Sequence, residues 1–312
     1  MGVTRKPTTK GIFKALLSEG LGAFTFTFVT VCAYASSRLI SSDGWLPARL
    51  LVDAVVHGLS YGFCIYLAIY QTWECHFFNP AIATAISLAE SLSHGTRWPM
   101  KHRSVIVKTL SIIGVQLLGT LAGICVVFLV IPNAVGNKEV LGTPQLRFGS
   151  TFGSGFLLES LGSFFLTLIV LVAVSFHQPM TRSSSIAVAV GLASSALQLF
   201  LYPFTSASLN PTRAISLMLC SWSFSLETLL YLTAPFVGSL LATLYFIGSF
   251  TVTPLDLRMG ESELSFQDHG RSGIEDPSVN FRPSDADGVA YVGGDDDLSK
   301  RQVYEPSKSV YS

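Results

Sequence analysis

The chain has 312 residues, of which 49% are hydrophobic and only 13% are charged. Since about 25% of the residues of soluble domains are charged, this composition excludes an ordinary soluble protein and indicates a membrane protein. The net charge is zero, but the charges are unevenly distributed along the chain. Residues 1–250 contain 14 Lys and Arg and 8 Asp and Glu, whereas residues 251–312 contain 6 Lys and Arg and 12 Asp and Glu.

Six apolar stretches are long enough to cross a bilayer, which takes about 20 residues in a helix. In chain order they cover residues 13–35, 50–70, 104–131, 155–176, 186–202 and 226–250. The polar segment 1–12 precedes them, and the acidic segment 251–312, which has no apolar periodicity, is predicted to be a disordered tail. We therefore predict an all-α membrane protein with its membrane domain over 13–250.

Two shorter apolar runs, 82–92 and 214–220, lie among these spans and each follows an Asn-Pro pair. The pairs belong to Asn79-Pro80-Ala81 and Asn210-Pro211-Thr212. Asn is a favoured helix N-cap and Pro is favoured at the first helical position, so each motif predicts a helix start. A helix start inside a membrane has to be buried in protein or line a water-filled cavity.

The chain also repeats itself, because the six residues that begin at Glu19 (EGLGAF) resemble those that begin at Glu159 (ESLGSF). Likewise Gln116-x-x-Gly119 corresponds to Pro235-x-x-Gly238, and the two Asn-Pro motifs correspond to each other. Each half thus has three spans and one short helix. Since three is odd, the second half is inserted upside down relative to the first.

This inverted repeat brings the two short helices in from opposite faces of the membrane. Their N-termini, each carrying about half a positive charge, then meet near the midplane. Each Asn side chain can cap its helix through its oxygen and direct an NH2 donor into the lumen. Such a site favours a neutral molecule with lone pairs and repels cations and protons.

Positive charges predict the orientation of the spans. Arg and Lys residues are concentrated before the first span and between the first short helix and the third span. With six crossings, these two regions lie on the same side of the membrane. The positive-inside rule therefore places both termini in the cytoplasm, and the plasma membrane is the default location.

The chain resembles the aquaporin (major intrinsic protein) family over about residues 13–250. The residues that carry the resemblance are both Asn-Pro motifs, Arg213, Glu19, Glu159, Gln116 and the run from Pro235 to Gly238. The resemblance implies six transmembrane helices with two re-entrant half-helices, a homotetramer with one pore per subunit, and passive conduction of water. It implies no cofactor, no metal and no nucleic-acid partner.

The resemblance also implies roles for particular residues. The narrow constriction of the pore maps onto His57, Gln198, Ala207 and Arg213. Arg213 would supply N–H donors to the permeating molecule and a barrier to cations, and the alternative for His57 is a hydrogen-bonded core residue. Glu19 and Glu159 would brace the loops that carry the short helices, with proton handling as the alternative.

Several positions depart from the family pattern. A bulky loop, WECHFF at residues 73–78, replaces the usual small-residue loop before the first motif, and Thr212 replaces the usual Ala. Ala214 stands where glycerol-conducting relatives have Asp. With His57 and Gln198 in place of a larger ring and a His, we expect a wider, more polar constriction that passes ammonia or urea besides water.

Other functional classes fit the sequence less well. An enzyme is not supported, because no nucleophile–base spacing, metal-ligand cluster or Gly-rich phosphate loop is present. A secondary transporter would need a site for a coupling ion. An aquaglyceroporin-like solute facilitator and a junctional or structural protein built on the channel fold remain as alternatives.

Overall fold

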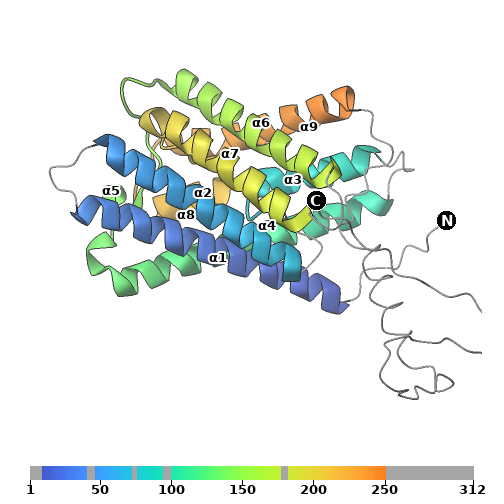
Figure 1. Ribbon diagram of the computed structural model, residues 1–312, viewed down its shortest axis with the longest axis horizontal. Helices are drawn as coiled ribbons and strands as arrows, with labels where there is room; N and C mark the ends of the chain where they lie inside the picture. The colour runs from blue at the N-terminus through green and yellow to red at the C-terminus, as the bar shows by residue number, and fades with distance from the viewer. Residues whose placement is uncertain (1–8, 41–45, 72–75, 94–99, 177–181, 251–312) are drawn as a thin grey trace, which may run out of the picture. The chain divides into compact units, whose positions relative to one another are not determined.

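The structure is a computed structural model that describes residues 9–40, 46–71, 76–93, 100–176 and 182–250. All of these residues fall within one compact unit, Met1–Leu264, whose helices are shown in Figure 1. The predicted tail, 251–312, lies outside the described residues, so its predicted disorder stays a prediction.

Six helices in the described part of the chain are long and apolar enough to cross a membrane, as the sequence predicted. They are α1 (Thr9–Ile40), α2 (Leu46–Gln71), α4 (Met100–Val130), α6 (Phe152–Phe176), α7 (Arg182–Thr205) and α9 (Glu227–Ser249). Several extend beyond the predicted apolar stretches, and α1 is the longest with 32 residues. The hydrocarbon core of a bilayer is about 30 Å thick, and at about 1.5 Å per residue α1 is longer than that. The polar ends of α1 therefore continue the helix beyond the core.

Two further helices are too short to cross the membrane, α3 (Pro80–Ser93) with 14 residues and α8 (Pro211–Cys220) with 10. Each begins at the proline of an Asn-Pro motif, as predicted. The connection between α4 and α6 contains a 3-10 turn, η1 (Pro132–Ala134), and a single helical turn, α5 (Lys138–Leu141). These two elements were not predicted from the sequence, because a turn of three or four residues has no hydrophobic periodicity.

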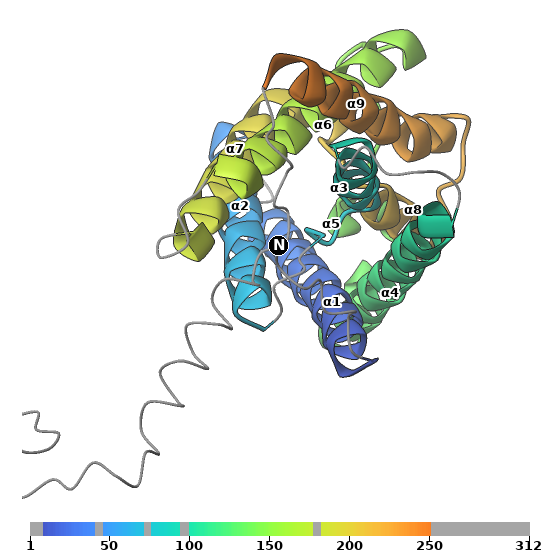
Figure 2. The same cartoon turned by 90° about the vertical axis from the view of Figure 1, so that its right-hand side faces the viewer.

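The long helices surround the short ones (Figure 2). Helix α1 packs against α2 and α4, α7 packs against α2 and α6, and α9 packs against α6. Helices α3 and α8 each pack against both α4 and α9 and also touch each other. The two half-length helices therefore join α4 to α9 and complete the ring of long helices.

The repeat seen in the sequence has an atomic counterpart in two close helix crossings. A Cβ atom at Gly119 of α4 would lie 2.1 Å from the backbone oxygen of Gly20 in α1. A Cβ atom at Gly238 of α9 would lie 2.0 Å from the backbone oxygen of Ser160 in α6. Both contacts require glycine, and both oxygens belong to the residue that follows a repeated glutamate, Glu19 or Glu159. Small residues allow such close approaches between membrane helices.

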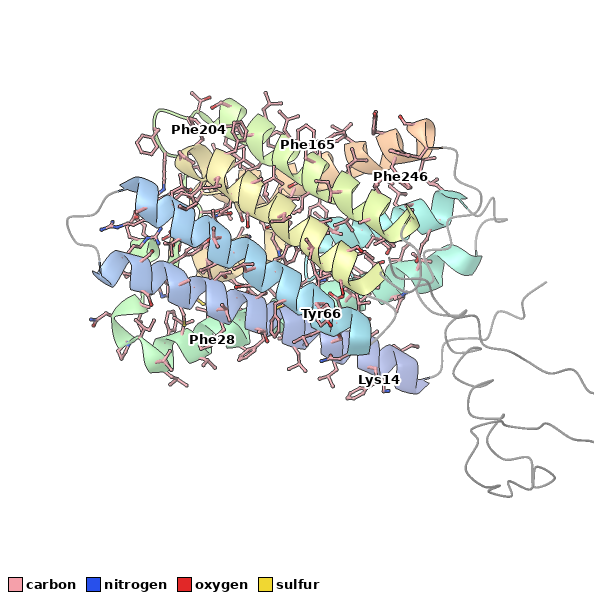
Figure 3. All side chains as sticks on the ribbon, in the orientation of Figure 1. Lys14, Phe28, Tyr66, Phe165, Phe204 and Phe246 are labelled. Carbon is pink, nitrogen blue, oxygen red and sulfur yellow. The ribbon has the colours of Figure 1, made fainter. Side chains whose placement is uncertain are left out.

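Apolar side chains also cover the outward faces of the long helices (Figure 3). On α6, for example, Leu157 and Phe165 are exposed while Val170 is fully buried. A soluble helix would carry polar groups on its outward face. Large apolar side chains on that face are typical of a surface that lies against lipid or against another subunit.

Candidate pore site

The N-termini of α3 and α8 are capped in the same way by the asparagines that precede them. The side-chain oxygen of Asn79 accepts a hydrogen bond from Ala81 N (3.0 Å). The side-chain oxygen of Asn210 accepts from Thr212 N (3.1 Å) and Arg213 N (3.4 Å). The proline at the first helical position has no N–H that would need a partner. These caps satisfy backbone donors that the surrounding apolar side chains cannot satisfy.

Each of the two asparagines also donates to the chain segment that carries the other. Asn79 Nδ2 donates to the backbone oxygen of Leu209 (2.8 Å), and Asn210 Nδ2 donates to that of Phe78 (2.9 Å). Because Phe78 precedes Asn79 and Leu209 precedes Asn210, the two bonds are related by the inverted repeat. The sequence predicted that the NH2 donors point into the lumen. In the structure one N–H of each amide donates to a backbone carbonyl, and the other has no partner among the described residues.

Glu19 of α1 accepts hydrogen bonds from the loop before Asn79. Its carboxylate oxygens accept from the backbone N of His76 and from Phe78 N (3.1 Å). Gln116 of α4 donates its side-chain amide to the same carboxylate (2.9 Å). Glu19 is fully buried, so these donors replace the water that a carboxylate would otherwise bind.

Glu159 of α6 accepts hydrogen bonds from the loop before Asn210. Its carboxylate accepts from Ser208 N (3.0 Å), Leu209 N (2.8 Å) and the hydroxyl of Thr205 (2.6 Å). Phe78 and Leu209, which donate to the two glutamates, both have a positive φ, 53° and 49°. A positive φ is unfavourable for such bulky residues and persists only when the surroundings hold it. The two carboxylates provide that restraint.

Thr212 differs from the alanine that is usual at this position, and its hydroxyl forms a hydrogen bond. Thr212 Oγ1 donates to the side-chain oxygen of Asn210 at 2.8 Å. From the sequence, Thr212 was expected to alter packing more than chemistry. Here the hydroxyl adds a third donor to the capping oxygen of Asn210, besides the two backbone N–H groups.

The residues expected at the constriction come from three elements and a loop, and a tyrosine links two of them. His57 lies in α2, Gln198 in α7, Arg213 in α8, and Ala207 in the loop between α7 and α8. The hydroxyl of Tyr34, in α1, is 3.0 Å from His57 Nδ1 and accepts a hydrogen bond from Gln198 Nε2 at 3.0 Å. Tyr34 was not predicted as a site residue, and its signal in the sequence was a tyrosine near the end of the mainly apolar first span.

Arg213 has N–H donors that are buried without a hydrogen-bond partner. Its side chain is 1% exposed, and no described residue bonds its Nε and Nη2 atoms. Its guanidinium carbon lies 5.3 Å from the ring centroid of Tyr34. Leaving a buried donor unpaired costs about 1–3 kcal/mol, and more for a charged group. Arg213 therefore presents donors that a small hydrogen-bond acceptor can satisfy.

A family model described as "Major intrinsic protein" matches residues 6–246, which include every residue of the site. The chain belongs to this family. Family membership confirms the resemblance on which the site residues were chosen, and it confirms that the protein is a membrane channel and not an enzyme.

Named relatives of this major intrinsic protein are distant in sequence. It is 29% identical over 243 residues to Aquaporin A of Dictyostelium discoideum, covering 77% of this chain and 80% of that one. It is also 29% identical to the lens fiber major intrinsic protein of Gallus gallus, with 78% and 83% covered. The solved structure of the aquaglyceroporin from Plasmodium falciparum has a TM-score of 0.60 at 18% identity, covering 75% of this chain and 95% of that one. At this identity the likeness shows the fold alone, and it confirms the predicted fold class.

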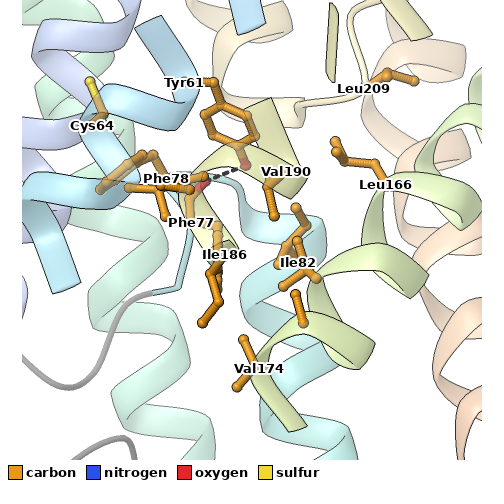
Figure 4. Packing of buried hydrophobic residues seen from close by; sticks show 14 of the residues in the cluster. Tyr61, Cys64, Phe77, Phe78, Ile82, Leu166, Val174, Ile186, Val190 and Leu209 are labelled. Atoms are coloured by element: carbon orange, nitrogen blue, oxygen red, sulfur yellow. Dashed lines mark hydrogen bonds between the residues drawn. The ribbon is translucent and has the colours of Figure 1, made fainter. Parts of the chain in front are cut away.

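The loop before the first motif is one of the places where this major intrinsic protein departs from the family pattern. Phe77 and Phe78 are fully buried, and the ring of Phe78 occupies the space beside Gly22, where a Cβ would lie 2.0 Å from it. The hydroxyl of Tyr61 donates to the backbone oxygen of Phe77 at 2.7 Å (Figure 4). Phe77 and Phe78 are therefore part of the core. Residues 72–75 of this loop lie outside the described residues.

Proposed function

We propose that this protein is a passive water channel that also passes small neutral solutes such as ammonia or urea. The observation that carries the proposal is Arg213, whose Nε and Nη2 donors are buried and unpartnered beside the two capped half-helices. Water and small amides offer lone pairs to such donors, whereas cations are repelled by the guanidinium and by the positive ends of α3 and α8.

The half-helices supply selectivity against charge in this proposal. Asn79 and Asn210 each keep one side-chain N–H after bonding a backbone oxygen, and these N–H groups would orient the permeating molecule. Glu19 and Glu159 brace the two loops, because each accepts backbone N–H donors from the loop next to it. The asparagine N–H groups favour a molecule that accepts hydrogen bonds, and the positive helix ends disfavour cations.

The side chains at the constriction favour solutes somewhat larger than water. A His57 ring is smaller than the phenylalanine common in water-selective relatives, and Gln198 is flexible and unbranched. Ala207 adds almost no bulk. Glycerol is a poorer candidate, since Ala214 follows Arg213 where glycerol-conducting relatives have Asp.

The assembly and location of the channel follow the family and the charge pattern. We place both termini in the cytoplasm by the positive-inside rule, and the plasma membrane is the default location. The family resemblance supports a homotetramer with one pore in each subunit, and the exposed apolar residues of α6 are available to lipid or a neighbouring subunit.

The rate at which proteoliposomes change volume in an osmotic gradient tests the proposal. Vesicles with the purified protein, compared with protein-free vesicles of the same lipid, should shrink faster in an impermeant gradient, in proportion to the gradient and without saturation. Inward gradients of urea, ammonia and glycerol, measured in the same vesicles, give the solute range. Saturating flux would indicate a carrier, and glycerol flux above urea flux would indicate a glycerol facilitator. Water flux equal to that of protein-free vesicles would contradict the proposal and favour a structural role.

A further inference from the structure

We infer that Tyr34 is a fifth residue of the constriction, and that its side chain closes the passage between His57, Gln198 and Arg213. This inference rests on the proposed function, because it concerns the path that a permeating molecule would take. It adds a determinant that lies on α1, outside the four positions expected from the family pattern.

The hydroxyl of Tyr34 lies between His57 and Gln198. One oxygen atom lies 3.0 Å from His57 Nδ1 and 3.0 Å from Gln198 Nε2. His57 and Gln198 come from different helices, α2 and α7, and are two of the groups that would otherwise bind a permeating molecule. A phenol that bonds both of them occupies the position of that molecule and uses its hydrogen-bonding partners.

The ring of Tyr34 lies against the guanidinium of Arg213. The ring centroid lies 5.3 Å from the guanidinium carbon of Arg213, within the range of a cation–π contact. Tyr34 and Gln198 are each 1% exposed, and His57 is 6% exposed. Residues that line an open aqueous path would be in contact with water. Here the ring covers Arg213 while the Nε and Nη2 donors of the guanidinium remain unpartnered.

Surrounding groups hold the Tyr34 ring in place. The guanidinium of Arg38 lies 5.4 Å from the ring centroid of Tyr34, and it donates to the backbone oxygen of Tyr34 (2.9 Å) and to Asp53 (3.1 Å). At Gly142, which has a φ of 65°, a Cβ atom would lie 2.6 Å from the ring. The ring thus fits a space that glycine provides, in the connection between α4 and α6.

Tyr34 also explains how small side chains can coexist with a covered constriction. His57 and Gln198 leave more room than a phenylalanine and a histidine would, and the Tyr34 ring lies between them. When the ring leaves this position, water or urea can take over the hydrogen bonds to His57, Gln198 and Arg213. The ring position therefore sets both the rate of conduction and the largest solute that passes.

The test compares wild type, Tyr34→Ala and Tyr34→Phe in proteoliposomes, with permeability divided by the measured protein per vesicle. Phe246→Ala is the matched control, because it also removes a fully buried aromatic ring but lies in α9 outside the site. Tyr34→Ala should raise water permeability per channel about threefold or more and raise the ratio of urea to water flux. Tyr34→Phe, which loses the hydroxyl but keeps the ring, should give a smaller rise. Phe246→Ala should give no rise.

Four outcomes would overturn the inference. Unchanged or lower water permeability in Tyr34→Ala, with wild-type conduction intact, would refute it without affecting the proposed function. An equal rise in Phe246→Ala would show that any core cavity has the same effect. If Tyr34→Ala does not fold, Tyr34→Phe decides, and wild-type flux and selectivity in that variant would refute the inference. A silent wild type with a conducting Tyr34→Ala would support it, whereas no conduction by any variant would refute it together with the proposed function.

Discussion

Asn79 and Asn210 each cap one half-helix and bind the segment that carries the other. Asn79 donates to the carbonyl of Leu209, at 2.8 Å, and Asn210 donates to that of Phe78, at 2.9 Å. The N–H groups of the same two residues, Phe78 and Leu209, donate to Glu19 and Glu159. A carboxylate of one half therefore holds the loop that accepts a hydrogen bond from the asparagine of the other half.

These reciprocal bonds predict the effect of removing one donor. Asn79→Asp and Asn210→Asp keep the capping oxygen but cannot donate to the opposite carbonyl, so each should lower the free energy of unfolding by about 1–3 kcal/mol. Thermal unfolding in detergent measures the change. Asn137→Asp is the matched control, because Asn137 caps α5 at an exposed position, and it should change stability by less than about 0.5 kcal/mol. Equal effects at all three positions would contradict the prediction.

The two glutamates should be equivalent in stability. Glu19→Gln and Glu159→Gln each replace a carboxylate that accepts three hydrogen bonds from described residues, and hydrogen bonds to a charged group are worth about 1.5–3 kcal/mol. Both variants should therefore unfold at a lower temperature than wild type, by similar amounts. Loss of stability in only one of them would show that the two loops are not braced in the same way.

Arg213→Val should preserve water flow and admit protons or small cations. The substitution removes the buried positive charge, and each reduction of about 1.4 kcal/mol in the electrostatic barrier raises the leak about tenfold. A pH-sensitive dye inside proteoliposomes measures the proton flux. Arg147→Val is the control, since Arg147 forms a partly exposed ion pair with Glu139. Because the dipoles of α3 and α8 can mask part of the effect, a variant that combines Arg213→Val with Asn79→Asp completes the set. A leak-free Arg213→Val with unchanged selectivity would contradict the assigned role.

The double change His57→Phe with Gln198→His should abolish urea and ammonia flux and spare water flow. Both substitutions add a ring at the constriction, and together they remove the flexible amide. Fluxes are compared with those of wild type in the same vesicles. If wild type already excludes both solutes as completely as the double variant does, the protein is a plain water channel.

Acid should loosen the connection between α4 and α6 through Glu139. Partial burial raises the pKa of Glu139, but hydrogen bonds from Gln145 (2.6 Å) and Arg147 (3.0 Å) outweigh it and hold the pKa below its ordinary value. The resulting stability is present above the ordinary pKa and is lost as pH falls through the lowered one. For this exposed pair we expect less than about 1 kcal/mol. Thermal unfolding against pH should show a smaller acid loss in Glu139→Gln, and an identical loss would contradict the assignment.

Local pattern was sufficient to predict the six spans and the starts of both half-helices. A span is a run of apolar residues, and a helix start is an Asn-Pro pair, so each depends on residues close together in the chain. The repeated glutamates and glycines could also be compared directly between the two halves. Helices α5 and η1 could not be predicted, because they are too short to show a period.

The contacts of Tyr34 depend on tertiary packing. Tyr34 is separated by 23 positions from His57 and by 164 from Gln198, and the three residues lie on α1, α2 and α7. In the sequence it is one aromatic residue in an apolar span, which lipid, a neighbouring helix or a pore would accommodate equally. Its position follows from how α1 packs against α2 and from the space beside Gly142. Both are long-range contacts, which no local pattern of residues specifies.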